Sequence, residues 1–276
     1  MANSTLPERI RRDFPILDRS VHGKPLVYLD NAASAQKPLA VIEGQREYLA
    51  NYHANIHRGA HHLAQLATEA YEGTRGKIAD HIGAGSTEEI IFTAGSTDAV
   101  NLVTQSWGRA NLSAGDTVLV TRMEHHANIV PWQMVCAEKG AEVVPVDVQE
   151  DGTLDLEDFA RKLERHQPKL VGVVHASNTL GTINPVAELC AAARTAGAVT
   201  LVDGSQALPH LTIDVAAIGC DIYVATGHKA YGPTGIGFLW GRRDLLDAMP
   251  PWRGGGEMIR SCLLYTSPSP RDGTKS

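Results

Sequence analysis

Long hydrophobic runs are missing from this chain of 276 residues. The longest apolar stretches, such as residues 170–174 (LVGVV), are far shorter than the roughly 20 residues that a membrane-spanning helix needs. Charges at Glu8, Arg9 and Arg11 interrupt the start of the chain before an apolar segment typical of a secretory signal could form. We therefore expect no membrane span, no secretory signal and a cytoplasmic location.

Paired cysteines and an excess of positive charge are also missing. The four cysteines stand far apart without a CxxC pair, which favours reduced thiols over a disulfide framework. A formal net charge of −6 gives no indication of the basic face that nucleic-acid binding requires. With 43% apolar and 20% charged residues the composition is that of a globular protein. These absences favour small-molecule chemistry as the function class.

Short β-branched runs alternate with helical patterns from about residue 85 onward. This alternation predicts an α/β fold, a mostly parallel sheet of seven strands covered by helices on both faces. The expected strands span residues 89–93, 117–121, 141–148, 169–174, 199–203, 221–225 and 235–240. Helices are expected at 63–82, 98–107 and 188–196, the first and last of them ending at glycines.

Polar residues follow several of these strands, at the edge where open α/β sheets bind their ligands. Lys229 comes shortly after the strand at 221–225. Because burial favours the neutral amine, which attacks carbonyls, Lys229 is a candidate for Schiff-base chemistry; the alternative is a solvated loop lysine. Asp203 ends the strand at 199–203. A carboxylate there needs a cation such as a protonated pyridine nitrogen, unless it caps a turn or binds a metal.

The segment AGST at 94–97 joins an expected strand to an expected helix. Its glycine allows close approach of the backbone, and the free N–H groups of the first helical turn can bind a phosphate dianion together with the hydroxyls of Ser96 and Thr97. The same residue types also cap helices where no ligand is bound.

Two further strand ends carry imidazole and amide groups. His125 or His126, after the strand at 117–121, could lie against an aromatic ring and move protons, or form a metal site or a surface pair. Zinc is disfavoured and no metal is expected, because further ligands at a recognisable spacing are missing. Asn178 could bind a ligand or cap a turn. An imine-forming lysine, a ring counter-ion, a phosphate cradle, a stacking group and an amide together match one cofactor, pyridoxal 5′-phosphate.

Eight segments, in order along the chain, resemble those of one enzyme family. They are YLDNAASAQKP (28–38), HANIHRGAHHLA (53–64), TAGSTDAVNLV (93–103), MEHHANIVPWQM (123–134), HASNTLGTINP (175–185), VDGSQALPH (202–210), ATGHKAYGPTGIGFLWG (225–241) and PPWRGGGEMI (250–259). On these segments the chain resembles the cysteine desulfurases of the sulfur-mobilisation (SUF, group II) type, which are pyridoxal phosphate enzymes of the class V aminotransferase-like group. The resemblance implies the fold type I architecture of such transferases.

The resemblance also implies a role for each matching residue. Lys229 would hold the cofactor as a Schiff base, Asp203 would pair with its pyridine nitrogen, and Gln206 would bind its ring hydroxyl. His125 would stack on the ring and assist proton transfer, and Asn178 would lie near the substrate carboxylate. The residues implied around the phosphate are Ser96, Thr97, Thr226 and His228.

The implied reaction removes sulfur from L-cysteine and leaves L-alanine. The sulfur becomes a persulfide on an enzyme cysteine and passes to an acceptor protein of the SUF system for iron–sulfur cluster assembly. His57 and Arg58 match a segment near the active-site entrance of a homodimer. The implied domains are a pyridoxal phosphate-binding large domain at 21–259 and an N-terminal segment at 1–20 that joins the small domain in complete members.

After about residue 260 the chain departs from the family pattern. Complete members place the persulfide-forming cysteine and a carboxylate-binding arginine beyond the GGG segment, and the neighbours of Cys262 do not match that cysteine loop. Cys136, Cys190 and Cys220 have the sequence contexts of core thiols. We therefore expect a truncated desulfurase without its nucleophile or its small C-terminal domain, with little turnover and a disordered or artefactual tail at 260–276. The alternatives are a selenocysteine lyase, another class V enzyme such as a kynureninase-like hydrolase or an epimerase, and a catalytically inert fragment.

Overall fold

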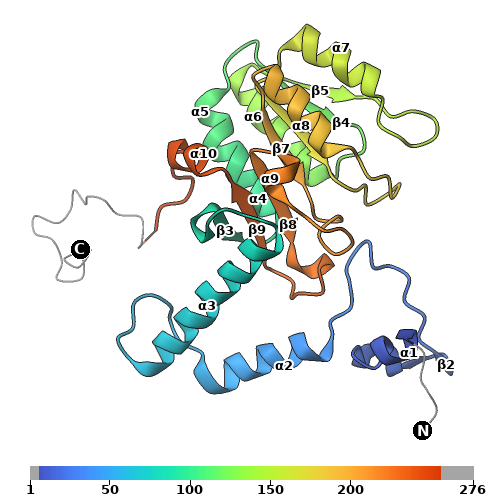
Figure 1. Cartoon of the computed structure of the whole chain (residues 1–276), viewed down its shortest axis with the longest axis vertical. Coiled ribbons are helices and arrows are strands. Elements are labelled where there is room, and N and C mark those ends of the chain that lie inside the picture. The colour runs from blue at the N-terminus through green and yellow to red at the C-terminus, as the bar shows by residue number, and fades with distance from the viewer. Residues whose placement is uncertain (1–5, 256–276) are drawn as a thin grey trace, which may run out of the picture.

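Seven strands form one sheet in the computed structural model, which describes residues 6–255 (Figure 1). The sheet order is β3-β9-β8-β7-β6-β4-β5. The strands are β3 (Ile90–Thr93), β4 (Thr117–Thr121), β5 (Glu142–Val146), β6 (Leu170–Val174), β7 (Val199–Asp203), β8 (Ile222–Thr226) and β9 (Gly237–Gly241). Only β9 runs antiparallel to its neighbours β3 and β8, so the predicted mostly parallel, seven-stranded α/β sheet is confirmed.

The inner strands are buried on both faces, which explains why their sequences are nearly continuous apolar runs. Every residue of β4, β6, β8 and β9 is buried. The edge strand β5 is more exposed and carries Pro145, whose missing N–H is tolerated at a sheet edge. This strand is shorter than the predicted 141–148, because Val148 pairs only in an isolated bridge with Leu154.

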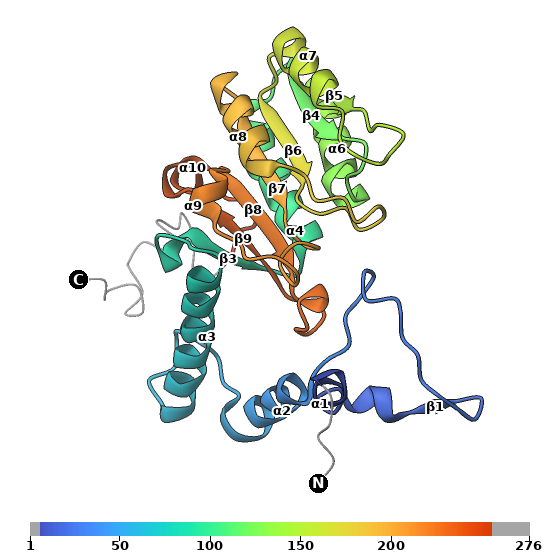
Figure 2. The same cartoon turned by 45° about the vertical axis from the view of Figure 1, so that its right-hand side comes forward.

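Two apolar layers lie on opposite faces of the sheet, because side chains alternate along each strand. Leu119 packs in the layer beneath α7 (Leu156–His166), α8 (Val186–Thr195) and α9 (Val215–Ile218). Val118 and Val120 pack in the layer beneath α4 (Ser96–Val103) and α6 (Val130–Lys139). Helices therefore cover both faces, as predicted (Figure 2).

The helix predicted at 98–107 begins earlier and changes its winding. It starts at Ser96 and passes at Thr104 into a π-helical turn, η4 (Thr104–Gly108), followed by α5 (Arg109–Asn111). Val100, Val103 and Trp107 are nevertheless all buried in one layer. The predicted apolar face is thus correct although the helix is not regular throughout.

The N-terminal part lies to one side of the sheet (Figure 2). Its elements are α1 (Leu6–Arg11), η1 (Pro15–Asp18), β1 (Ser20–Val21), β2 (Lys24–Pro25), α2 (Leu39–Glu47), η2 (Tyr48–Tyr52) and α3 (His62–His81). The chain between β2 and α2 returns to the sheet, where the Ala35 N–H donates to the carbonyl of His228 at 3.0 Å. The predicted domain boundaries at residues 20 and 259 stay predictions.

The remaining short elements are η3 (Thr87–Glu89), η5 (His126–Asn128), η6 (Gly227–Lys229) and α10 (Arg243–Ala248). Between residues 6 and 255, no helix combines the length and apolar character needed to cross a membrane. Cys262 and the predicted tail at 260–276 lie outside the described residues.

Candidate active site

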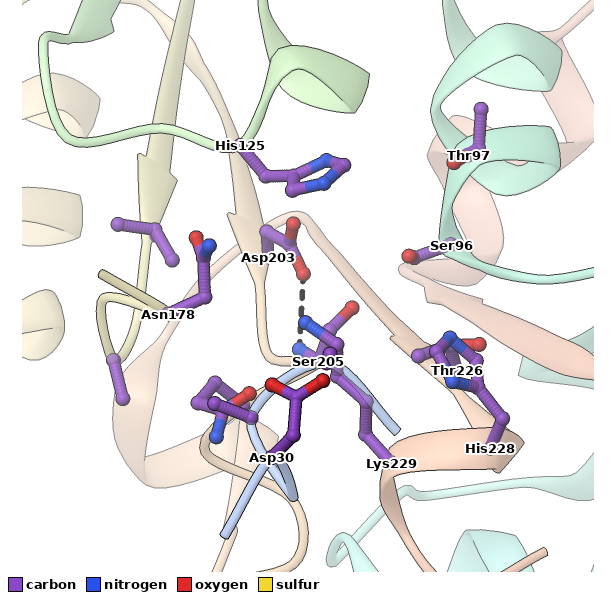
Figure 3. A pocket seen from close by; sticks show the side chains of 15 residues that line it. Asp30, Ser96, Thr97, His125, Asn178, Asp203, Ser205, Thr226, His228 and Lys229 are labelled. Atoms are coloured by element: carbon purple, nitrogen blue, oxygen red, sulfur yellow. Dashed lines mark hydrogen bonds between the residues drawn. The ribbon is translucent and has the colours of Figure 1, made fainter. Parts of the chain in front are cut away.

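Nine of the predicted site residues line one cavity of about 480 Å³ at the carboxyl ends of the parallel strands (Figure 3). They are Ser96, Thr97, His125, Asn178, Asp203, Gln206, Thr226, His228 and Lys229. They come from the segments that follow β3, β4, β6, β7 and β8, whose carboxyl ends meet at this edge of the sheet. The volume is within the range of small-molecule sites. The structure thus brings these residues together, while their chemical roles stay predictions.

Lys229 lies in the short turn η6, directly after the buried strand β8. This turn packs closely on the residue before β9: a Cβ added at Gly227 would stand 2.9 Å from Cγ2 of Ile236. The Gly227 N–H donates to the carbonyl of Ile236 at 2.9 Å. Burial lowers the pKa of Lys229, and the neighbouring Asp203 carboxylate raises it by less. The amine therefore loses its proton more readily than an exposed lysine does.

Asp203 ends β7 and is only 3% exposed. Its Oδ1 accepts a hydrogen bond from the backbone N–H of Ser205 at 2.9 Å. Among the described residues its carboxylate has no ion pair within salt-bridge distance. A buried carboxylate without a paired cation is costly, so this position favours a ligand that brings positive charge.

The sharp turn after Asp203 depends on Gly204. A Cβ at Gly204 would lie 2.0 Å from Oη of Tyr223, which is itself fully buried. That hydroxyl stands 3.2 Å from Nδ1 of His175. The absence of a side chain at position 204 therefore lets the chain pass over Tyr223 and brings Ser205 to the cavity wall.

Two buried polar atoms of the cavity wall have no hydrogen-bond partner in the described part of the chain. They are Oγ of Ser205 and Oε1 of Gln206. Leaving such groups unsatisfied costs about 1–3 kcal/mol each, which a polar ligand in the cavity would offset. These two atoms are independent support for a polar ligand beside Asp203.

The loop before α4, for which the sequence predicts phosphate binding, is held tightly against the sheet. Gly95 has a φ of 153°, a conformation almost restricted to glycine. A Cβ at Gly237 of β9 would stand 2.6 Å from Cα of Gly95, so the loop is pressed against the sheet. Asp98 caps the loop by accepting from the Ala94 N–H at 3.1 Å and pairs with Arg253 at 2.6 Å. The helix start with Ser96 and Thr97 is thereby fixed at the cavity rim.

Of the two adjacent histidines, His125 lines the cavity and His126 does not. Nδ1 of His125 accepts a hydrogen bond from the Ala127 N–H at 3.1 Å. An N–H can only donate, so in the neutral ring the proton is on Nε2. In Figure 3 the imidazole extends into the cavity near the Asp203 carboxylate.

His57 and Arg58 are not brought to this cavity. They precede α3 in the N-terminal part and are exposed. Nε2 of His57 lies 3.2 Å from Glu72 Oε1, and its ring contacts Tyr71 edge-on at 5.7 Å. The predicted entrance role of His57 and Arg58 stays a prediction.

Six lining residues had not been singled out from the sequence, and two of them are polar, Asp30 and Ser205. Asp30 arrives from the N-terminal segment, beyond the reach of any rule about strand ends. The signal for both was their place inside segments already matched to the family, YLDNAASAQKP and VDGSQALPH.

A further missed residue, Glu124, precedes His125 but is buried behind the cavity. Burial raises the pKa of Glu124 to about 7, although hydrogen bonds from Thr121 and Asn128 lower it. An acidic residue three positions after the end of a wholly buried strand was the available signal.

Three cysteines in the described residues are buried free thiols, in agreement with the prediction that they belong to the core. Burial raises the pKa of Cys136 and of Cys190 to about 11 and that of Cys220 well above its usual value. Since a thiolate is the reactive form, none of the three has the properties of a nucleophile.

Known proteins with similar sequences include two cysteine desulfurases. A cysteine desulfurase of Klebsiella pneumoniae (strain 342) is 52% identical over 257 residues, 93% of this chain and 63% of that protein. A probable cysteine desulfurase of Xylella fastidiosa is 53% identical over 253 residues, 92% of this chain and 60% of that protein. The chain thus spans about 63% of the length of the first curated relatives that it matches.

Solved structures show the same likeness. The cysteine desulfurase CsdA of Escherichia coli superposes with a TM-score of 0.84 at 37% identity, covering 94% of this chain and 64% of that one. The apo cysteine desulfurase of Thermococcus onnurineus NA1 gives a TM-score of 0.86 at 36% identity, covering 100% and 68%. Residues 27–271 match the family described as aminotransferase class-V. The chain belongs to the class V aminotransferase family.

Proposed function

We propose that this chain is the pyridoxal phosphate-binding part of a cysteine desulfurase. The observation that carries the proposal is that Lys229, whose pKa is lowered by burial, and the buried carboxylate of Asp203 line the same cavity. When bound, pyridoxal phosphate supplies an aldehyde that condenses with amines, releasing water, and a protonated ring that accepts electrons from the substrate α-carbon. The unpartnered atoms of Ser205 and Gln206 fit its polar substituents.

Each residue of the cavity has a task of its own in this proposal. Lys229 would hold the cofactor through Nζ and would serve as the base for the substrate α-proton. Asp203 keeps the ring nitrogen protonated by placing a negative charge beside it. His125 holds the ring and carries its mobile proton on Nε2. The residues proposed to hold the phosphate are Ser96, Thr97, Thr226 and His228, with Asn178 left for the substrate carboxylate.

The thiol that takes sulfur from L-cysteine is, we infer, not among residues 6–255, because the three cysteines found there are buried with raised pKa values. We expect little or no desulfurase turnover from this chain by itself. Homodimer formation and delivery of sulfur to a SUF acceptor protein for iron–sulfur cluster assembly are parts of the proposal that rest on the resemblance, and the cytoplasmic location is an expectation from the sequence.

Incubation of the purified chain with pyridoxal phosphate tests the proposal. We expect an absorbance band near the visible edge that disappears in Lys229→Ala and persists in the control Lys77→Ala, an exposed lysine of α3. Borohydride reduction followed by peptide mapping should place the cofactor on Lys229. Attachment to other lysines alone, or no band at all, would contradict the proposal and support an inert fragment. Turnover of L-cysteine against L-selenocysteine by a longer version of the protein would then separate desulfurase from selenocysteine lyase.

A further inference from the structure

Glu124 and His125 are neighbours in the chain whose side chains have opposite surroundings. The His125 ring is exposed and lines the cavity, whereas the Glu124 side chain is buried and only 8% of the residue is exposed. The Glu124 carboxylate belongs to none of the roles described above. Its contacts nevertheless tie together the elements that carry His125.

Both carboxylate oxygens of Glu124 accept hydrogen bonds. Oε1 accepts from the hydroxyl of Thr121, at the end of β4, and from the backbone N–H of Val174, at the end of β6, both at 2.6 Å. Oε2 accepts from Nδ2 of Asn128 at 2.8 Å. One side chain thus links two strand ends to the turn η5.

The link replaces missing sheet pairing. Strands β4 and β6 pair only as far as Val120 and Gly172, while β6 continues alongside β7 to Val174. Beyond Gly172 the sheet opens between β4 and β6, and Glu124 accepts the N–H of Val174 there. The carboxylate therefore closes the sheet at the point where the cavity begins.

Asn128 connects Glu124 to His125. Its Oδ1 accepts from Nε1 of the fully buried Trp132 at 3.1 Å, which fixes the orientation of the amide and turns Nδ2 towards Glu124. The Asn128 backbone N–H donates to the carbonyl of His125 at 2.8 Å. Gly172 leaves the room for this amide, since a Cβ there would stand 3.1 Å from Nδ2 of Asn128.

We propose that Glu124 is a positioning residue that fixes the His125 turn against the ends of β4 and β6, so that the imidazole is held at one place in the cavity. This inference deepens the proposed function, because the imidazole is held against the cofactor ring that we propose to bind there. Glu124 acts through His125 and Asn128 and has no contact of its own with the cavity.

At a pH above the pKa of about 7, where Glu124 is a carboxylate, the variant Glu124→Gln tests the link because glutamine has the same shape but one donor end. If the glutamine oxygen faces Val174, the glutamine NH2 group faces the NH2 group of Asn128. If the glutamine is turned the other way, its NH2 group faces the backbone N–H of Val174. Either way two donors meet. In the double variant Glu124→Gln/Asn128→Asp the glutamine amide donates to the new carboxylate, which still accepts from Trp132. The hydrogen-bond pattern is restored, and the negative charge moves from position 124 to position 128.

Two readouts report on His125 rather than on general stability. In the cofactor-free chain the ¹H–¹³C resonance of the His125 ring, assigned by its loss in His125→Ala, should shift and broaden in Glu124→Gln and return in the double variant. In the chain loaded with pyridoxal phosphate, induced circular dichroism of the cofactor band should fall at least threefold and recover in the double variant. Glu124→Gln should add nothing to the loss seen in His125→Ala, because residues that act as a unit are not additive.

The proposal is overturned if Glu124→Gln leaves the His125 resonance and the induced dichroism unchanged, or if the double variant is no closer to the wild type than the single variant. Far-UV circular dichroism establishes that the variants are folded. If the wild-type chain shows no Lys229-dependent band, the proposed function fails, yet the resonance of the cofactor-free chain still tests the role of Glu124.

Discussion

Asp203 and Lys229 face one cavity from the ends of the adjacent strands β7 and β8. The carboxylate raises the pKa of the lysine, while burial lowers it by more. The two effects together leave an amine that is neutral at lower pH than a free lysine but still senses the acid beside it. The effect of the carboxylate on the pKa of Lys229 can be measured separately from the effect of burial.

Asp203→Asn should lower the pKa of Lys229 further, because it removes the charge that favours the ammonium form and keeps an oxygen for the Ser205 N–H. A reagent that reacts only with neutral amines labels Lys229 in the cofactor-free chain at several pH values. Mass spectrometry then gives the extent of labelling at each pH, and from it the pKa of Lys229. The exposed Asp80→Asn on α3 is the matched control and should leave the profile unchanged. A profile displaced to higher pH in Asp203→Asn would contradict the assignment.

Gly204→Ala should destabilise the chain strongly, since the added Cβ would stand 2.0 Å from Oη of the buried Tyr223. Overpacking of this kind costs about 1–3 kcal/mol or more. The matched control is Gly44→Ala in α2, where nothing lies within 4 Å of the added Cβ. There alanine should stabilise the helix by up to about 1 kcal/mol. Denaturant unfolding of both variants measures the difference, and equal effects would show that Tyr223 can move aside.

The strands could be predicted from the sequence because most of them are buried on both faces. Residues 117–121 and 199–203 were predicted with the bounds that the structure has. The bounds were wrong by up to two residues for the edge strand β5, where exposure weakens the apolar pattern, and also for the buried strand β9, which begins at Gly237 and not at the predicted residue 235. The N-terminal segments have no such pattern, and their approach to the sheet depends on tertiary hydrogen bonds that Ser34, Ala35 and Lys37 make with His228.

The cavity residues at strand ends could be predicted for a geometric reason: parallel strands bring their carboxyl ends to one edge. The same reasoning could not find Asp30, which reaches the cavity from a distant segment. It also could not find the network of Glu124, because the sequence does not show that adjacent side chains point into the core and into the cavity. The choice between His125 and His126 likewise required the turn geometry of η5.

Glu124 should make the stability of the cofactor-free chain depend on pH. Its pKa is raised by burial from the ordinary 4.5 to about 7 in the folded protein. Between these values the folded state binds more protons than the unfolded state, so the contribution of Glu124 to stability is complete below pH 4.5 and is lost as the pH rises through 7. At about 1.4 kcal/mol per pKa unit the loss amounts to roughly 3 kcal/mol.

Unfolding free energies of the wild type and of Glu124→Gln, measured from pH 5 to pH 8 or so, check this prediction. Glutamine does not titrate, so the stability of the wild type relative to the variant should decline as the pH rises. A relative stability that stays constant, or that increases with pH, would show that Glu124 titrates in the folded chain as it does in the unfolded one.

The three core thiols should be inert in the folded chain. Cys136, Cys190 and Cys220 are buried, and the raised pKa values leave almost no thiolate at pH 8. Site-resolved mass spectrometry after brief alkylation at that pH should find these three cysteines unmodified, and all of them modified in denaturant. Cys190→Ala should therefore leave the alkylation of the native chain unchanged. The variant should lower the stability of the folded chain, because a buried thiol packs as a small apolar group. Rapid alkylation of any of the three in the native state would mean that the sheet opens locally, and would return that cysteine to the candidates for the sulfur-accepting nucleophile.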